Sequence, residues 1–332
     1  MREPAFWWRK AGLAAGLLTP FGKVYGAITA RRMAEKGAQA EVPVLCVGNF
    51  TVGGAGKTPT VMMLARMLAD AGERPFCLSR GYGGSISGPK LVDPRNDLAI
   101  QVGDEALLLA HVAPTVVARD RVAGARFAGA QGASVIVMDD GLQNPSLKKD
   151  LRLALVDARR GIGNGCTFPA GPLRAPLAAQ LAQIDALLVV GEDAGANDVI
   201  MQARARGLQI LRGRLTPDPA AAAALKGRNV LAFAGIGDPE KFFATAVGAG
   251  IAVKKQRSFP DHYRYTAEDA GELIMQAEHD GLALLTTEKD RARMAGELLL
   301  AALATRARTL PVTMAVTEAS ELRRLVMSKL RR

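Results

Sequence analysis

Residues 47–58 read Val47-Gly48-Asn49-Phe50-Thr51-Val52-Gly53-Gly54-Ala55-Gly56-Lys57-Thr58, between an apolar run and a segment with helical periodicity. Glycines let such a loop curl so that successive backbone N–H groups point at phosphate oxygens, and the helix that follows adds partial positive charge. A lysine at the end of the loop bridges β- and γ-phosphates, and the next hydroxyl binds Mg²⁺. The stretch therefore predicts a phosphate-binding loop (P-loop) in which residues 51–58 hold a nucleotide.

One position of this loop departs from the common G-x-x-x-x-G-K-[ST] pattern. Thr51 stands where that pattern has glycine, and Gly53 and Gly54 would supply the flexibility instead. Pro59 is tolerated at the start of the helix, because its N–H would lie among the unpaired donors of the first turn. The alternative is a glycine turn that only caps a helix. The Lys-Thr pair directly after the glycines, at a strand–helix junction, favours the P-loop.

The composition sets the class of protein. A chain of 332 residues is long enough for two domains or one large α/β unit. Its 49% apolar and 23% charged residues are those of a globular protein and exclude a disordered or fibrous chain. Three cysteines and three histidines exclude a disulfide scaffold and a histidine-rich metal centre, and they fit a reducing compartment.

Apolar runs of strand length alternate with helical patterns from residue 43 onward. Most runs are continuously apolar, as in parallel strands that are buried on both faces. This order predicts a doubly wound α/β fold of the P-loop NTPase type with a mostly parallel sheet. The predicted strands are Val44–Val47, Pro75–Ser79, Thr115–Ala118, Val135–Asp139, Leu151–Asp157, Ala186–Val190, Leu208–Leu215, Val230–Ala234, Ala252–Ser258, Ala283–Thr286 and Pro311–Val316. The predicted helices include Lys57–Ala71, Asp120–Gly132, Glu240–Ala249 and Ala267–His279.

Residues 215–228 have no clear strand or helix pattern and divide this alternation into two parts. They hold prolines, an alanine run and a Lys-Gly-Arg triplet, and a fresh strand follows them. We therefore expect a P-loop domain over residues 37–215 and a second, smaller α/β domain over residues 228–332 that closes over the site. An N-terminal amphipathic helical segment over residues 1–36 would precede them.

The net charge of +11 is concentrated at the two ends of the chain. Residues 1–36 carry a net charge of +5 and residues 321–332 carry +4, so the 284 residues between them carry only +2. A nucleic-acid enzyme more often has a basic stripe through its body. Basic ends on a near-neutral body favour an anionic membrane surface as partner, and no nucleic acid.

The N-terminal segment has helical periodicity, and Thr19-Pro20 has the pattern of an N-cap followed by a first-turn proline. We therefore expect two helices, at about residues 5–18 and 20–36. Trp7 and Trp8 beside basic residues suit a headgroup boundary. The longest apolar stretch is 12 residues, too short for the ~20 that span a bilayer. The alternatives are a signal peptide with residues 11–18 as its apolar region, or a helix packed on the body.

Several polar clusters follow predicted strands or open helices, where a parallel sheet collects its ligands. Val135–Asp140 is an apolar strand that ends in two carboxylates, which after a P-loop indicates a function linked to Mg²⁺ for Asp139 or Asp140. The other clusters are Ser79–Gly84, Val102–Glu105 and Phe259–Tyr263. Taken singly, Asp104 and Glu105 could be favourable first-turn charges of a helix, and His262 an ordinary loop histidine.

Taken together, the motifs and their order resemble those of the tetraacyldisaccharide 4′-kinases, which phosphorylate the lipid A precursor in Gram-negative bacteria. The resemblance runs from the N-terminal helix to about residue 294, and Thr51 matches the P-loop variant of that family. The motifs that carry it are Thr51–Thr58, Arg80–Gly84, Gly103–Glu105, Asp139–Gln143, Phe168–Arg174, Phe259–Tyr263 and Thr287–Asp290.

The resemblance implies transfer of the γ-phosphate of ATP to the 4′-hydroxyl of tetraacyldisaccharide 1-phosphate. Asp104 would be the catalytic carboxylate and His262 its partner in a dyad, since a carboxylate oriented by a second group can accept the proton of a sugar hydroxyl. The resemblance further implies Mg²⁺ ligands and substrate-binding side chains. These are Thr58, Glu105 and Asp139 for Mg²⁺, and Arg119, Arg174 and Gln143 for the substrate.

The implied substrate also explains the basic ends. Its acyl chains lie in the bilayer, so the enzyme would dock, as a peripheral protein and a monomer, on the cytoplasmic face of the inner membrane. Other P-loop proteins remain as alternatives: a GTPase switch or metallochaperone, a ParA-like partner ATPase, or a nucleic-acid-dependent ATPase. Guanine-binding proteins use an N-K-x-D order, whereas residues 287–290 read Thr-Glu-Lys-Asp.

Overall fold

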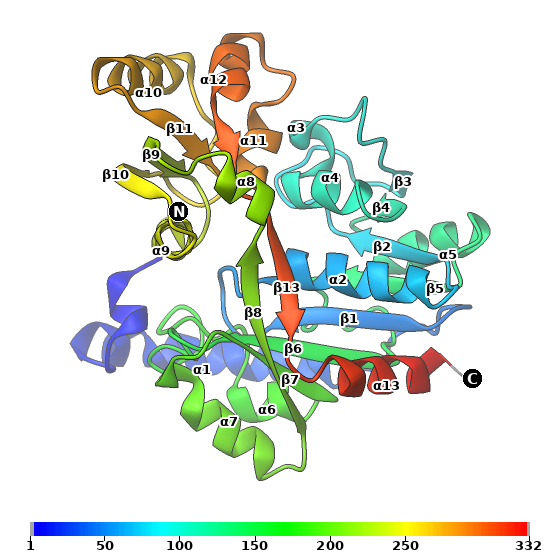
Figure 1. Cartoon of the computed structure of the whole chain (residues 1–332). Coiled ribbons are helices and arrows are strands. Elements are labelled where there is room, and N and C mark those ends of the chain that lie inside the picture. The colour runs from blue at the N-terminus through cyan, green and yellow to red at the C-terminus, as the bar shows by residue number, and fades with distance from the viewer. Residues whose placement is uncertain (1–2, 331–332) are drawn as a thin grey trace.

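A computed structural model describes residues 3–330 of the chain as two sheets with their helices (Figure 1). The strands of the larger sheet are β1 (Val44–Asn49), β2 (Pro75–Ser79), β3 (Lys90–Leu91), β4 (Thr115–Val117), β5 (Val135–Asp139), β6 (Leu151–Asp157), β7 (Ala186–Val190), β8 (Gln209–Pro217) and β13 (Val312–Val316). Their order is β13-β8-β7-β6-β1-β5-β2-β4-β3. Only the pairs of the edge strands β13 and β3 are antiparallel. The predicted doubly wound, mostly parallel α/β fold is confirmed.

Helices cover both faces of this sheet, which explains the continuously apolar strands. One face packs against α2, α4 and α13, and the other against α5, α6 and α7. The helices of this domain are α2 (Lys57–Asp70), α3 (Ala99–Val102), α4 (Asp104–Ala110), α5 (Arg121–Ala130), α6 (Leu177–Leu181), α7 (Asn197–Arg204) and α13 (Ala319–Leu330), with a 3₁₀ turn η2 (Ala194–Ala196).

The smaller domain has its own sheet and its own core. Its strands are β9 (Asn229–Ala234), β10 (Ala252–Ser258), β11 (Ala283–Thr286) and β12 (Arg308–Thr309), in the order β10-β9-β11-β12. Its other elements are α8 (Pro219–Ala223), α9 (Pro239–Gly248), α10 (Ala267–His279), α11 (Glu288–Met294), η3 (Leu298–Leu300) and α12 (Ala301–Arg306). Phe233 and Leu273 lie at the centre of one cluster and Phe243 in another.

The predicted extent of the smaller domain, residues 228–332, is wrong at its C-terminal end. Strand β13 pairs with β8 in the larger sheet, and α13 packs on the same sheet. The chain therefore crosses between the domains twice, and the two crossings are bonded to each other, because Asp218 N–H donates to the Pro311 carbonyl at 2.8 Å. A short apolar run predicts a strand without showing which sheet it joins. Residues 1–2 and 331–332, at the basic ends, lie outside the described residues.

The N-terminal segment forms one long helix, so the two helices expected at about residues 5–18 and 20–36 are wrong. A 3₁₀ turn, η1 (Ala5–Trp8), precedes α1 (Leu13–Met33), and Pro20 lies inside α1. The Thr19 hydroxyl donates to the Ala15 carbonyl at 2.8 Å instead of capping a second helix. Pro20 removes one backbone hydrogen bond, to the carbonyl of Gly16. That residue is exposed, so water can satisfy the carbonyl.

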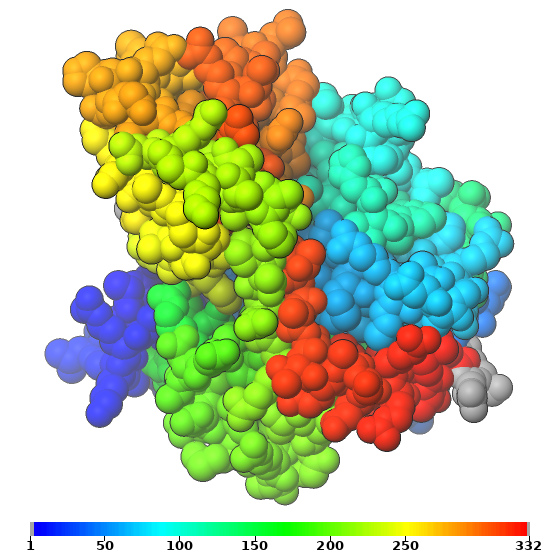
Figure 2. Space-filling view, viewed as in Figure 1, coloured from blue at the N-terminus to red at the C-terminus, as the bar shows by residue number. Residues whose placement is uncertain are grey.

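Helix α1 carries small residues on its inner side and large apolar ones on its outer side. Ala15, Gly22, Gly26 and Met33 face the body and are buried. The outer side exposes large apolar side chains whose exposed fractions are 90% for Leu13, 77% for Leu17, 66% for Phe21, 62% for Val24 and 57% for Ile28. The N-terminal part of the chain protrudes beside the body at the left of Figure 2. Within residues 3–330, no helix is both long and apolar enough to cross a bilayer.

The two tryptophans hold this segment to the body. Trp7 is buried, and its indole N–H donates to the Pro169 carbonyl at 3.0 Å. Trp8 donates to the Glu3 carboxylate at 3.0 Å, and the Arg160 guanidinium lies 4.8 Å from its ring centre. The expectation that both tryptophans lie at a headgroup boundary is therefore wrong for Trp7.

The inner side of α1 generates a stability prediction. Replacing an interior helical glycine by alanine gains about 1 kcal/mol in helix propensity. A Cβ at Gly16 meets nothing within 4 Å, whereas one at Gly22 would lie 2.8 Å from the Thr167 carbonyl oxygen. We expect Gly16→Ala to raise the melting temperature and Gly22→Ala to lower it, measured by differential scanning calorimetry. Equal shifts for the two variants would show that α1 does not pack on residue 167.

Candidate active site

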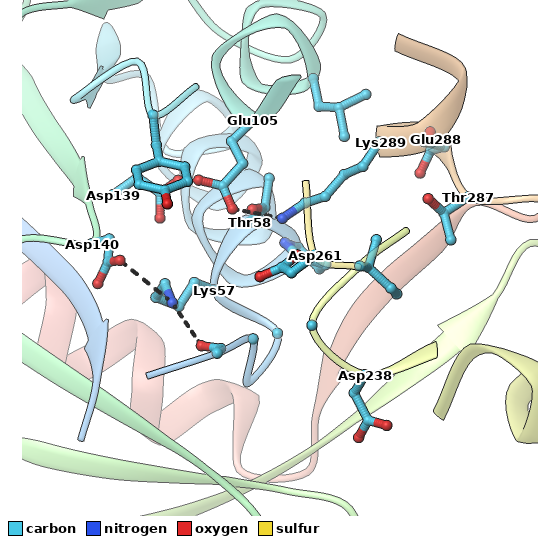
Figure 3. Close-up of a pocket in the computed structure, with 18 of the residues that line it drawn as sticks. Lys57, Thr58, Glu105, Asp139, Asp140, Asp238, Asp261, Thr287, Glu288 and Lys289 are labelled. Carbon is cyan, nitrogen blue, oxygen red and sulfur yellow. Dashed lines mark hydrogen bonds and ion pairs between the residues drawn. The ribbon is translucent and has the colours of Figure 1, made fainter. Parts of the chain in front are cut away.

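A cavity of about 440 Å³ lies between the carboxyl ends of the central strands and the loops of the smaller domain. This is where open parallel sheets bind ligands. The P-loop forms one wall, the loop after β10 another, and the start of α11 a third (Figure 3). The site is therefore shared by the two domains.

Most of the P-loop lines this cleft. The backbone is left-handed at Gly53 (φ 95°) and Gly56 (φ 88°), where glycine is needed. The Lys57 ammonium lies 3.2 Å from Asn49 Oδ1 and 3.4 Å from the Gly53 carbonyl oxygen. It lies 3.6 Å from Asp140, as the dashed lines of Figure 3 show. The cleft-lining residues of the predicted set are Val52, Gly53, Gly54, Gly56, Lys57 and Thr58.

The other two residues of the predicted set, Thr51 and Ala55, lie behind the loop. Thr51 forms a β-bridge with Leu173, and its carbonyl accepts a hydrogen bond from Arg174 Nε at 2.8 Å. Its φ is not positive, so a side chain is tolerated where the common pattern has glycine. Ala55 is buried in the core of the larger domain.

The two carboxylates at the end of β5 have different surroundings. Asp140 accepts two hydrogen bonds from Arg174, at 3.0 and 3.1 Å. Burial opposes ionisation of Asp140, but the charges of Arg174 and Lys57 outweigh it and lower its pKa. Both carboxylate oxygens of Asp139 are buried without a hydrogen-bond partner among the described residues. Burial raises the pKa of Asp139 to about 7, and the charges of Glu105 and Asp140 add to the rise.

The orphaned oxygens of Asp139 fit a cation. Thr58, Glu105 and Asp139, the residues predicted to bind Mg²⁺, line the same cleft, and their role as ligands stays a prediction. In residues 3–330 no three Asp, Glu, His or Cys side chains form a complete metal cage. Mg²⁺ needs no such cage, because it commonly binds through one or two carboxylates, water and substrate phosphates. The donor set is therefore suited to a Mg²⁺ that arrives with a nucleotide.

Asp104 and His262 come from different domains and meet beside the cleft. Asp104 begins α4, and its Oδ2 lies 3.5 Å from Nδ1 of His262, in the loop after β10. His262 has a φ of 54° and packs on the Tyr82 ring, with 4.7 Å between ring centres. Burial alone would lower the pKa of His262, but the bond to Asp104 and its charge raise it. His262 lines the cleft, whereas the Asp104 side chain is 2% exposed.

Helix α11 supplies two cations that were not predicted as site residues, although Lys289 lies in the Thr287–Asp290 motif. Lys289 contacts Glu105 at 2.6 Å across the cleft (Figure 3). Arg293, one turn later, contacts Asp104 at 2.8 Å. Burial opposes the ionised form of Asp104, but His262, Lys289 and Arg293 outweigh it and lower its pKa. The spacing of four residues between the two cations was a usable signal, but nothing in the sequence showed that α11 faces α4.

The three residues predicted for the substrate lie in different places. Arg174 lines the cleft. Arg119 is exposed outside the cleft lining, and its guanidinium lies 3.5 Å from the Gly84 carbonyl oxygen. Gln143 lies behind the P-loop and donates to the Asn49 carbonyl and to Gln180, both at 2.8 Å. Two further arginines, Arg80 and Arg121, line the cleft. Neither was predicted to bind substrate, although Arg80 lies in the Ser79–Gly84 cluster and Arg121 follows a predicted strand.

The buried Asp139 generates a pH prediction. Its pKa is about 7 in the folded chain and about 3.9 in an unfolded one, so its ionisation opposes folding increasingly as the pH rises between these values. We expect Asp139→Asn to raise the melting temperature of the nucleotide-free protein at pH 8 by on the order of 5 °C. The gain should be much smaller at pH 5. A calorimetric series in which the gain does not increase with pH would contradict this environment for Asp139.

Comparison with known proteins agrees with this geometry. Residues 14–331 match the family model described as tetraacyldisaccharide-1-P 4′-kinase (LpxK). A tetraacyldisaccharide 4′-kinase of Rhodopseudomonas palustris (strain BisB5) is 53% identical over 330 residues, which cover 99% of this chain and 97% of that one. One from Methylobacterium sp. (strain 4-46) is 57% identical over 307 residues, 92% of each chain.

The likeness extends to a solved structure. LpxK from Aquifex aeolicus, crystallised in a form described as "apo" and in complex with ATP, superposes with a TM-score of 0.72 at 28% identity. The superposition covers 96% of this chain and all of that one. With its P-loop, its two-domain cleft and these relatives, the chain belongs to the tetraacyldisaccharide-1-P 4′-kinase family, the lipid kinases of lipid A biosynthesis.

Proposed function

We propose that the chain transfers the γ-phosphate of ATP to the 4′-hydroxyl of tetraacyldisaccharide 1-phosphate, which gives lipid IVA. The observation that carries the proposal is the Asp104–His262 pair, which the smaller domain completes at the same cleft as Lys57 and Thr58. A partner ATPase or a GTPase switch needs phosphate-binding groups but no such carboxylate–histidine pair. Family membership and the ATP complex of the Aquifex aeolicus relative support the same assignment.

The P-loop and the pair divide the chemistry between them. The glycine loop and Lys57 hold the phosphates, and Lys57 exchanges its contacts with Asn49, Gly53 and Asp140 for the nucleotide. The acceptor oxygen attacks the γ-phosphorus, its proton passes to the Asp104–His262 pair, and ADP leaves with the electrons of the broken P–O bond.

Thr58, Glu105 and Asp139 would hold Mg²⁺ on the nucleotide. When bound, the ion neutralises negative charge on the phosphates as they react. To bind Mg²⁺, Glu105 would give up its contact with Lys289. The Lys289 ammonium would then be available beside the phosphate site. Arg174, which lines the cleft, would exchange its bonds with Asp140 for phosphate oxygens. Substrate-binding roles for Arg119 and Gln143 stay predictions.

The outer side of α1 supports a peripheral position on the cytoplasmic face of the inner membrane. Its exposed leucines and Phe21 would enter the headgroup boundary, and the basic residues beside them would contact anionic lipid. The acyl chains of the substrate could then stay in the bilayer while the sugar reaches the cleft. We propose that the enzyme acts there as a monomer without a nucleic-acid partner.

The kinase proposal is tested with radiolabelled ATP and tetraacyldisaccharide 1-phosphate in detergent micelles. We expect Lys57→Ala to abolish labelling of the lipid, because it removes positive charge from the phosphates. Asp104→Asn should lower kcat by about 100-fold or more while ATP affinity is largely kept. Near-wild-type kcat in Asp104→Asn would contradict the catalytic pair. Absence of lipid labelling by the wild type, despite ATP binding, would favour the partner ATPase.

The membrane proposal is tested by flotation with vesicles that contain anionic phospholipid. We expect the Leu17→Glu/Phe21→Glu double variant to lose most of its vesicle binding, because each charge must leave water at the boundary. Its affinity for ATP should not change. Met275→Glu is the matched control, since Met275 is similarly exposed (64%) but lies on α10 in the other domain. Equal flotation of wild type and the α1 double variant would remove the interfacial role of α1.

A further inference from the structure

Arg293 joins three parts of the site with one guanidinium. Its Nε donates to Asp104 Oδ2 at 2.8 Å, across the boundary between the domains. Its Nη1 donates to the Gly235 carbonyl at 2.8 Å and to the Tyr263 carbonyl at 3.3 Å, and lies 3.2 Å from Asp290. Tyr263 directly follows His262. The same side chain therefore holds the Asp104 carboxylate and the backbone that carries His262.

Asp104 is fixed from three sides by these contacts. Its Oδ1 accepts from the Glu105 backbone N–H at 2.9 Å. Its Oδ2 lies between Arg293 Nε at 2.8 Å and His262 Nδ1 at 3.5 Å. Charge-assisted bonds of this kind fix the plane of a carboxylate. Without Arg293, the Glu105 backbone N–H and the longer contact with His262 would be left to determine which way Asp104 faces.

Arg293 donates one hydrogen bond to Asp104, whereas a bidentate arginine–carboxylate pair has two. The Nε and Nη2 groups lie on the same edge of a guanidinium, and carboxylates commonly accept from both groups of such an edge. In the part of the chain that the structure describes, Arg293 Nη2 is buried without a partner, and the side chain is 8% exposed. An unmet buried donor is costly, so a state that completes this second bond is favoured.

The neighbouring cation on α11 is placed for a different task. Lys289 lines the cleft and contacts Glu105 through its ammonium group. Because an ammonium has no fixed geometry of donors, it can exchange this contact for one with a phosphate. Arg293 does not line the cleft, and its side chain is almost wholly buried between the domains. Contact with a bound nucleotide is therefore not the role that its position supports.

We propose that Arg293 is the positioning residue of the catalytic pair, which fixes Asp104 against His262 through its forked guanidinium, with Nη2 left to complete a two-bond grip on the carboxylate. The inference rests on the function proposed above. It assigns Arg293 no contact with substrate; the residue acts through Asp104. A lysine at this position would keep the positive charge but not the planar set of donors, so it should not restore the role of Arg293.

The test is a double-mutant cycle on the full-length enzyme, with lipid phosphorylation as the readout. We expect Arg293→Lys to lower kcat about 10- to 100-fold, with the KM for ATP and the stoichiometry of ATP binding unchanged. In the Asp104→Asn background, the same substitution should lower kcat less than 2-fold, because the residue through which Arg293 acts is already altered. Arg291→Lys, on the exposed side of α11, is the matched control and should match wild type.

A merely structural Arg293 would give another pattern. It would lower kcat by the same factor in both backgrounds, or lower the stoichiometry of ATP binding, and either result would overturn the inference. If Arg293→Lys fails to fold, Asp104→Asn/Arg293→Met removes the two charges of the Asp104–Arg293 pair together and should match Asp104→Asn in kcat. A further large loss in that variant would also overturn it. Wild-type activity of Asp104→Asn alone would instead reject the proposed catalytic pair.

Discussion

The site depends on two ion pairs between two helices. Two carboxylates at the start of one helix contact two cations that lie one turn apart on the other. Asp104 and Glu105 lie on α4 of the larger domain, and Lys289 and Arg293 lie on α11 of the smaller one. Breaking a buried pair by removing one partner leaves an uncompensated charge in the protein interior. The relative placement of the domains is therefore tied to the same contacts that orient Asp104 toward His262, the pair proposed above as catalytic.

The sequence alone predicted those features that depend on residues close together in the chain. The P-loop needs left-handed glycines before a lysine at a strand–helix junction, and residues 53–58 meet that demand within a few positions. The alternation of apolar strands and helices likewise predicted the fold. The contact of Asp104 with His262 could be expected only through the family resemblance, because 158 residues separate them and no periodicity links them.

Other features could not be predicted, since they depend on what a segment packs against. An apolar run such as Val312–Val316 does not show that it returns to the first sheet. In α1, bulky side chains face outward because Gly22 and Gly26 let the backbone approach Thr167 and Pro176. Arg293 lies in no recognised motif. Its contact with Asp104 becomes visible only when the two domains are placed together.

The double crossing between the domains limits how the cleft can open. Pro217 and Pro311 stand at the two crossings, each with a fixed φ, and the adjoining backbone bond from Asp218 ties one crossing to the other. A single linker would let the smaller domain swivel in any direction. Two tied strands would confine any opening to one axis, because twisting would break the bond between them. Successive openings would follow the same arc, and α11 would return to α4 in one register.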